Sequence, residues 1–90
     1  MKTVRIFIKG SVQSVFFRTF VKEQADELGI RGFVRNKEDG SVEVLAEGRD
    51  EKVYEMINKC KQGPKHAQII DVKIEEMKHQ GFEGFKILKI

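Results

Sequence analysis

The spacing of apolar residues changes on either side of the segment Gly10–Arg18, and this change constrains the fold more than any other feature. Before the segment, residues 2–9 alternate between apolar and polar side chains, which is typical of a strand with one buried face. After it, apolar residues recur at helical spacing as far as Gly29, a residue type that commonly ends a helix. A strand, a loop and a helix are therefore expected in that order. The apolar residues of the helix are Phe17, Phe20, Val21, Ala25 and Leu28.

The rest of the chain repeats these two patterns. Residues 30–36 and 41–47 are expected to form a hairpin across the turn Lys37–Gly40. Asp50 is expected to cap a second helix, which Gly63 and Pro64 end. Residues 69–77 alternate again, and residues 85–90 form a short terminal run. The residues expected to face inward are Val53, Met56, Ile57 and Cys60 in the second helix and Ile70, Val72 and Ile74 in the strand after it.

The order of these elements, β-α-β-β-α-β, indicates an α+β fold of the ferredoxin-like, split βαβ type. This sandwich has a mainly antiparallel sheet of four strands, or five if residues 85–90 form one, with both helices on one face. The 90 residues suit a single domain, residues 1–90, near the lower size at which a hydrophobic core sustains a fold without disulfides or metal.

Composition narrows the class of function. The net charge of +3 favours the approach of small anions, but it falls short of the dense basic surface of a nucleic-acid-binding protein. No segment has the apolar length of a membrane span or of a secretory signal, so a cytoplasmic protein with no nucleic-acid or membrane partner is expected. Cys60, the only cysteine, lies on a helical apolar stripe, which indicates a buried, unreactive thiol. His66 and His79 lack the spacing of metal ligands, and no metal site is expected.

The segment Gly10–Arg18, called the cradle loop below, is a candidate anion site. A loop that enters a helix presents unpaired backbone N–H groups at the positive end of the helix dipole. Arg18 adds a planar, permanently charged guanidinium that suits bidentate contact with a phosphate or carboxylate. The alternative is that Gly10 only makes a turn and Arg18 is a solvated helix residue.

Asn36 is the second candidate. A helix connects the first two strands, so a right-handed crossover makes them parallel and brings their C-terminal ends to the same sheet edge. Gly10 ends the first strand and Asn36 ends the second, so both are expected at one pocket. A neutral amide there can accept a hydrogen bond from water while donating to a carbonyl or phosphoryl oxygen. The alternative is a turn residue, because asparagine favours strand ends.

Two motifs make these candidates more specific. The run Ile8–Arg18 resembles the first signature of the acylphosphatase family, a glycine, then Val-Gln-Gly-Val, then an aromatic residue followed by arginine. The run Gly32–Val42, with Gly48, is similar to the second signature, and the likeness continues to Gly84–Ile87. One position departs from the pattern, because Ser14 stands where the family usually has glycine.

The resemblance implies a small, ferredoxin-like, metal-independent enzyme (EC 3.6.1.7) that hydrolyses acyl phosphates to a carboxylate and inorganic phosphate. It also implies that Asn36 orients the attacking water, and it implies no cofactor. A monomer acting on a small-molecule substrate is expected. The residues that it assigns to phosphate binding are Val12, Gln13, Ser14, Val15, Phe16, Phe17 and Arg18.

Ser14 leaves two alternatives open. If the usual glycine has a positive φ, serine would be strained by roughly 1 kcal/mol or more or would rearrange the loop. Otherwise the backbone is permissive and the Ser14 hydroxyl bonds locally, with Asn36 as one candidate partner. We expect an active enzyme that is slower than the family norm. The competing hypotheses are a catalytically weak anion-binding or regulatory module and, from Arg31–Phe33, an RNA-binding domain, which the apolar third strand disfavours.

Overall fold

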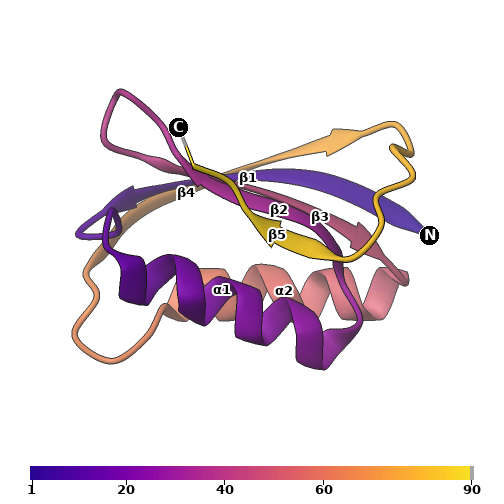
Figure 1. Ribbon diagram of the computed structural model, residues 1–90, viewed down its shortest axis with the longest axis horizontal. Helices are drawn as coiled ribbons and strands as arrows, with labels where there is room; N and C mark the ends of the chain where they lie inside the picture. Colours follow the sequence, from indigo (N-terminus) through magenta and orange to yellow (C-terminus); the bar gives the residue numbers. More distant parts are fainter. Residues whose placement is uncertain (90) are drawn as a thin grey trace.

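The computed structural model describes residues 1–89 (Figure 1). Strands and helices follow the expected order, with a short fifth strand near the end of the chain. The elements are β1 (Lys2–Gly10), α1 (Val15–Leu28), β2 (Arg31–Asn36), β3 (Val42–Gly48), α2 (Asp50–Gln62), β4 (Ile69–Met77) and β5 (Phe85–Ile87). The expected terminal run extended to residue 90, which lies outside the described residues.

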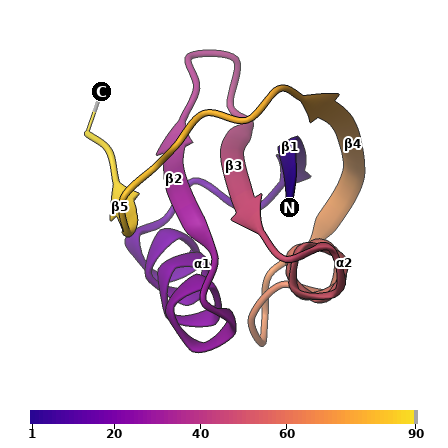
Figure 2. The same cartoon turned by 90° about the vertical axis from the view of Figure 1, so that its right-hand side faces the viewer.

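The sheet has the strand order β4-β1-β3-β2-β5. β3 is antiparallel to β1 and to β2, β4 is antiparallel to β1, and β5 is parallel to β2. Figure 2 shows both helices on the same face of this sheet. The predicted ferredoxin-like α+β sandwich with a mainly antiparallel sheet is therefore confirmed.

The core lies between the sheet and the two helices. The alternation in β1 buries Val4, Ile6 and Ile8 completely, and α1 contributes Phe17, Val21 and Ala25 to the same cluster. α2 adds its expected apolar stripe, and burial raises the pKa of the Cys60 thiol to about 12, as expected of an unreactive cysteine. Each large aliphatic side chain buried in this way contributes about 1.5–3 kcal/mol to folding. The four buried residues of α2 are Val53, Met56, Ile57 and Cys60.

Two local expectations were wrong. Ile70 was expected to face inward, but it is 79% exposed, because the β1–β4 register shifts at Lys9 and Gly10 and Ile69 packs on the core instead. Asp50 was expected to cap α2, but the cap position belongs to Arg49, which makes no side-chain capping bond. Asp50 is the first helical residue, where its charge favours the helix dipole.

Among residues 1–89, the helices are too short and too polar to cross a lipid bilayer.

Candidate active site

The topology brings the two candidate regions to one edge of the sheet. β1 and β2 both run antiparallel to β3, which lies between them, so they are parallel to each other. The cradle loop leaves the C-terminal end of β1, and Asn36 is the last residue of β2. Their meeting at this edge agrees with the geometry that the sequence predicts.

Gly10 fixes the path of the cradle loop. Its φ of 142° is a conformation that other residues rarely adopt, and an added Cβ would lie 1.9 Å from the backbone oxygen of Gln68. The next residue, Ser11, donates its N–H to that oxygen over 2.9 Å. One flank of the loop is therefore held against the backbone that leads into β4.

Gln13 holds the opposite flank. Its Nε2 donates to the backbone oxygens of Lys37, at 2.6 Å, and Ser41, at 2.9 Å. These two residues flank the turn that follows Asn36, and Lys37 N–H also donates to Ser41 O over 2.8 Å. The amide of Gln13 thus connects the cradle loop to the strand end that carries Asn36. The sequence predicts Gln13 as a phosphate-binding loop residue but not these contacts, because the partners lie 24 and 28 residues away.

Ser14 is unstrained. Its φ of −122° and ψ of 159° are extended backbone, so the possibility of a positive φ at this position was wrong. Its hydroxyl oxygen accepts a hydrogen bond from Phe17 N–H at 3.2 Å, which makes Ser14 the N-cap of α1. The hydroxyl does bond locally, but with Phe17 rather than with Asn36. The helix consequently begins at Val15, two residues before its first buried side chain.

Arg18 and Asn36 each carry a buried polar atom without a hydrogen-bond partner. Within residues 1–89, only three side-chain atoms are of this kind, and Arg18 Nε and Asn36 Oδ1 are two of them. The third, Arg5 Nε, lies 3.1 Å from a carboxylate oxygen of Glu43. Because an unpaired buried polar group costs about 1–3 kcal/mol, such atoms gathered at one edge indicate a binding site.

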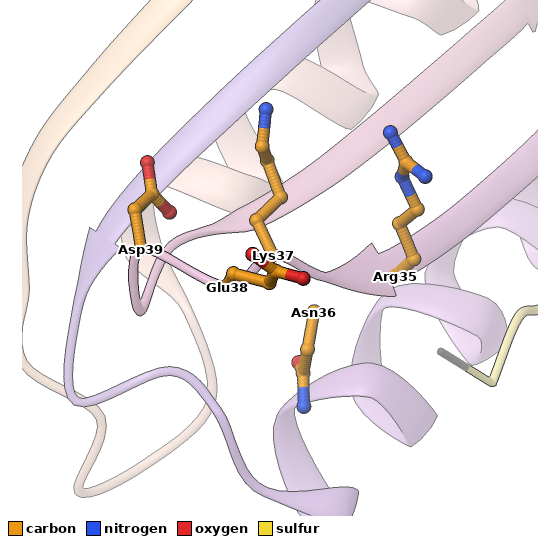
Figure 3. A pocket seen from close by; sticks show the side chains of 5 residues that line it. All are labelled: Arg35, Asn36, Lys37, Glu38 and Asp39. Carbon is orange, nitrogen blue, oxygen red and sulfur yellow. The ribbon is translucent and has the colours of Figure 1, made fainter.

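Two arginines on the other face of the sheet, Arg5 and Arg35, are already paired. Arg5 and Arg35 both contact Glu43, a carboxylate on β3 that is almost completely buried. This arrangement neutralises Arg35, the neighbour of Asn36. In Figure 3, the side chain of Asn36 points away from Arg35 and Lys37, toward the helix layer. Asn36 is therefore separated from the paired charges of its own strand.

Two hollows lie near the residues gathered at this edge. One, of about 370 Å³, surrounds Asn36 and is lined by residues 35–39. The other, of about 380 Å³, lies between the cradle loop and residues 64–67. Arg18 lines neither of them, so the structure brings the phosphate-binding candidates and Asn36 to one edge without enclosing them in a single cavity.

Asp39 acts within the turn. The hydroxyl of Ser41 donates to Asp39 Oδ1 over 2.6 Å, and the N–H of Ser41 donates to the same oxygen over 2.9 Å. These two bonds lower the pKa of Asp39, the hydroxyl contributing most. A carboxylate with a lowered pKa is a weak proton acceptor, so Asp39 is better suited to stabilising the turn than to activating water. Among residues 1–89, no three side chains of His, Cys, Asp or Glu cluster closely enough to hold a metal ion.

The fold and this edge define a class, a small α+β protein with a loop that enters a helix next to a strand-end amide. The profile of the family described as Acylphosphatase matches residues 4–87. The chain belongs to the acylphosphatase family.

Relatives and solved structures agree with this assignment. The chain is 42% identical to an acylphosphatase of Rubrobacter xylanophilus over 96% of its own length and 79% of that protein. It is 38% identical to an acylphosphatase of Methanocella arvoryzae over 97% and 99% of the two chains. The crystal structure of acylphosphatase from Bacillus subtilis superposes with a TM-score of 0.93 at 35% identity, covering 98% of this chain and 99% of that one.

Proposed function

We propose that this chain hydrolyses acyl phosphates, the mixed anhydrides of a carboxylic acid and phosphoric acid, to a carboxylate and inorganic phosphate. The observation that carries the proposal is the pair of unpartnered buried atoms, Arg18 Nε and Asn36 Oδ1, at the edge where the topology gathers both residues. The relatives named acylphosphatase supply the reaction class.

The cradle loop binds the phosphoryl group in this proposal. Its backbone amides from Val12 to Phe16 offer donors to the phosphoryl oxygens, and the guanidinium of Arg18 adds fixed positive charge. Phosphoryl transfer spreads negative charge over the equatorial oxygens, and preorganised donors stabilise that charge without reorganising. Gln13 and Ser11, which anchor the two flanks of the loop, supply this rigidity.

Asn36 positions the water. Its Oδ1 accepts a hydrogen bond from the water, and its NH₂ group donates to a phosphoryl oxygen. The water oxygen then forms a bond to phosphorus while the bond between phosphorus and the bridging oxygen breaks, leaving the electron pair on the carboxylate. The water proton passes to a phosphoryl oxygen, because Asp39 is engaged by Ser41. A carboxylate is a good leaving group, so no strong general acid is required.

The proposal includes a small-molecule acyl phosphate as substrate, no metal or cofactor, and a cytoplasmic monomer formed by a single domain. Positioning and charge stabilisation are sufficient for this leaving group.

The test is hydrolysis of benzoyl phosphate in the presence of a chelator, followed by ultraviolet absorbance. Arg18→Ala and Asn36→Ala are expected to lower kcat/KM by about 10²–10³-fold, the cost of removing one preorganised oxyanion donor. Arg49→Ala and Asn58→Ala are matched controls, because both residues are exposed and far from the cradle loop in sequence. Equal losses in the controls, or wild-type hydrolysis at the buffer rate, would contradict the proposal.

One observation favours a second candidate, a catalytically weak anion-binding module. The hydroxyl of Ser14 already accepts the N–H of Phe17, so one amide of the cradle loop has an internal partner. If the wild-type chain hydrolyses benzoyl phosphate only at the buffer rate but Ser14→Gly turns over, the chain is an acylphosphatase silenced at this residue.

A further inference from the structure

The hollow of about 380 Å³ and the turn after Asn36 lie on opposite sides of the cradle loop. Gln13 ties one flank to the turn after Asn36, and Ser11 ties the other flank to Gln68. In the sheet, β1 separates β4 from β3 and β2, so the segment entering β4 and the strand end carrying Asn36 cannot share a flank. Figure 1 shows the cradle loop between the β2–β3 turn and the segment that joins α2 to β4.

This separation determines the direction of the leaving group. In phosphoryl transfer, the attacking and leaving oxygens lie roughly in line on opposite sides of phosphorus. If Asn36 holds the water on the β2 flank, the bond to the bridging oxygen points toward the β4 flank. The hollow on that flank, about 380 Å³, is lined by Ser11, Ser14, Phe16 and Phe17 on one side and by residues 64–67 on the other.

The chemistry of this hollow indicates what kind of acyl group it takes. Phe16 is 80% exposed at its wall, where its ring offers an apolar surface. Lys65 and His66 also line it, and among the described residues its lining includes no aspartate or glutamate. Lys65 takes part in none of the ion pairs within residues 1–89. The hollow therefore combines an aromatic wall with a positive charge that no carboxylate within residues 1–89 pairs with.

Resting on the proposed function, we infer that this hollow is the acyl subsite and that it selects acyl phosphates whose acyl group carries an anionic group of its own. The aromatic wall contacts the body of the acyl group, and Lys65 pairs with its distal anion. After the anhydride bond breaks, the new carboxylate lies in the same hollow, from which it leaves toward solvent.

The test compares two substrates that differ only in the distal charge, benzoyl phosphate and 4-carboxybenzoyl phosphate. For each enzyme, the readout is the ratio of kcat/KM for the carboxylated substrate to kcat/KM for the parent. Because an exposed ion pair is weak, Lys65→Gln is expected to lower this ratio about threefold, and Lys65→Glu about tenfold. Lys61→Gln is the control, because Lys61 is an exposed lysine of α2 that lines a different hollow. This substitution changes the net charge by the same amount as Lys65→Gln.

Each result decides between the two proposals. An unchanged ratio in both Lys65 variants, or an equal change in Lys61→Gln, would overturn the acyl subsite while leaving the proposed function intact. Absence of hydrolysis of both substrates by the wild-type chain would overturn the proposed function and the subsite with it. Inhibition by inorganic phosphate, measured in parallel, is expected to weaken less than twofold in Lys65→Gln, because phosphate occupies the cradle loop rather than the hollow.

Discussion

The two ends of the sheet differ in whether their buried polar groups have hydrogen-bond partners. At the end that carries the cradle loop, Arg18 Nε and Asn36 Oδ1 are buried without partners. At the other end, the carboxylate of Glu47 is completely buried, yet it accepts hydrogen bonds from one side chain and from three consecutive backbone amides. We call this second arrangement the Glu47 latch; its donors are the Thr3 hydroxyl at 2.6 Å and the N–H groups of Gln80 at 2.7 Å, Gly81 at 3.0 Å and Phe82 at 3.1 Å.

Glu47 is an anion that the chain itself supplies to the donors of the latch, whereas the proposed function assigns the cradle loop to an anion of the substrate. The latch fixes the segment between β4 and β5 across the face of the sheet that carries no helix, where Phe82 meets the ring of Phe33 edge-on. At the cradle loop, Gly10 and Gln13 hold the backbone in place, and none of the hydrogen bonds among residues 1–89 joins a carboxylate to the loop. Buried polar groups stabilise the fold at the latch end, and we propose that they serve binding at the cradle end.

The largest expected effect is a loss of activity without a loss of stability, caused by substitutions at the end of the sheet that carries the cradle loop. Asn36→Asp keeps the size of the side chain but replaces its donor with a charge that repels phosphate, so kcat/KM for benzoyl phosphate is expected to fall by at least about 10²-fold. In Asn36→Ala, the free energy of unfolding, measured in urea, should change by less than about 1 kcal/mol, because Asn36 Oδ1 has no hydrogen-bond partner to lose. A large loss of stability with intact activity would contradict the proposed difference between the two ends of the sheet.

Glu47→Gln is expected to have the opposite effect, lowering the stability of the fold while leaving activity nearly unchanged. An amide cannot accept all the hydrogen bonds of the latch, and its NH₂ group would face backbone donors, so the free energy of unfolding should fall by about 3 kcal/mol. Activity at 25 °C should stay within about twofold while the protein remains folded. Glu83→Gln, an exposed change in the same segment, serves as the control and should be nearly neutral.

The latch also predicts a pH dependence. Burial alone would raise the pKa of Glu47, but the Gln80 N–H, the Thr3 hydroxyl, the Phe82 N–H and the charge of His79 together lower it from 4.5 to about 2. Because the folded-state pKa is depressed, this stabilisation is fully present above about pH 4.5 and is lost as the pH falls toward 2. At about 1.4 kcal/mol per unit, it amounts to about 3 kcal/mol. Urea unfolding between pH 2 and pH 7 should show this slope in the wild type and a smaller one in Glu47→Gln.

Variants of Gln13 test whether the anchoring of the cradle loop contributes to activity. Gln13→Ala removes both bonds to the turn after Asn36, and kcat is expected to fall about tenfold while KM changes less. Gln13→Glu, which keeps the size of the side chain but loses the donors, should lower kcat to the same extent as Gln13→Ala. Gln62→Ala on α2 is the control. If Gln13 acts through Asn36, the Gln13→Ala effect should largely disappear in an Asn36→Ala background. Additive losses would instead indicate a general structural role.

Ser14 is expected to have the smallest effects. Ser14→Ala removes the cap of α1 and should destabilise the fold by about 1 kcal/mol, whereas Ser14→Gly should cost only a few tenths. We also expect Ser14→Gly to raise kcat/KM by about two- to threefold, because it frees the N–H of Phe17 for the phosphoryl group. Equal rates for the wild type and Ser14→Gly would show that the serine does not slow the enzyme.

The elements of this fold could be predicted because their side chains repeat with the period of a strand or a helix. The common edge of Gly10 and Asn36 followed from strand order alone, since a crossover helix fixes the relative direction of β1 and β2. The exposed Ile70 could not be predicted, because a register shift reverses the alternation without a local signal. Gln13 was expected to bind phosphate, but its anchoring role and the whole role of Glu47 were missed for a related reason, because their partners are backbone groups of distant segments that no side-chain pattern marks.

The position of β3 has a consequence for how the protein acquires activity. β1 and β2 carry the two candidate regions but never touch, because β3 lies between them. β2 and β3 can pair as a local hairpin, whereas β1 must pair with β3 across a long stretch of chain, from Lys2 to Gly48 at its widest. Closing such a loop is slow relative to forming a hairpin. During refolding, we therefore expect catalysis to appear only when β3 has paired with β1, and we expect a chain that has formed only its hairpin and helices to be inactive.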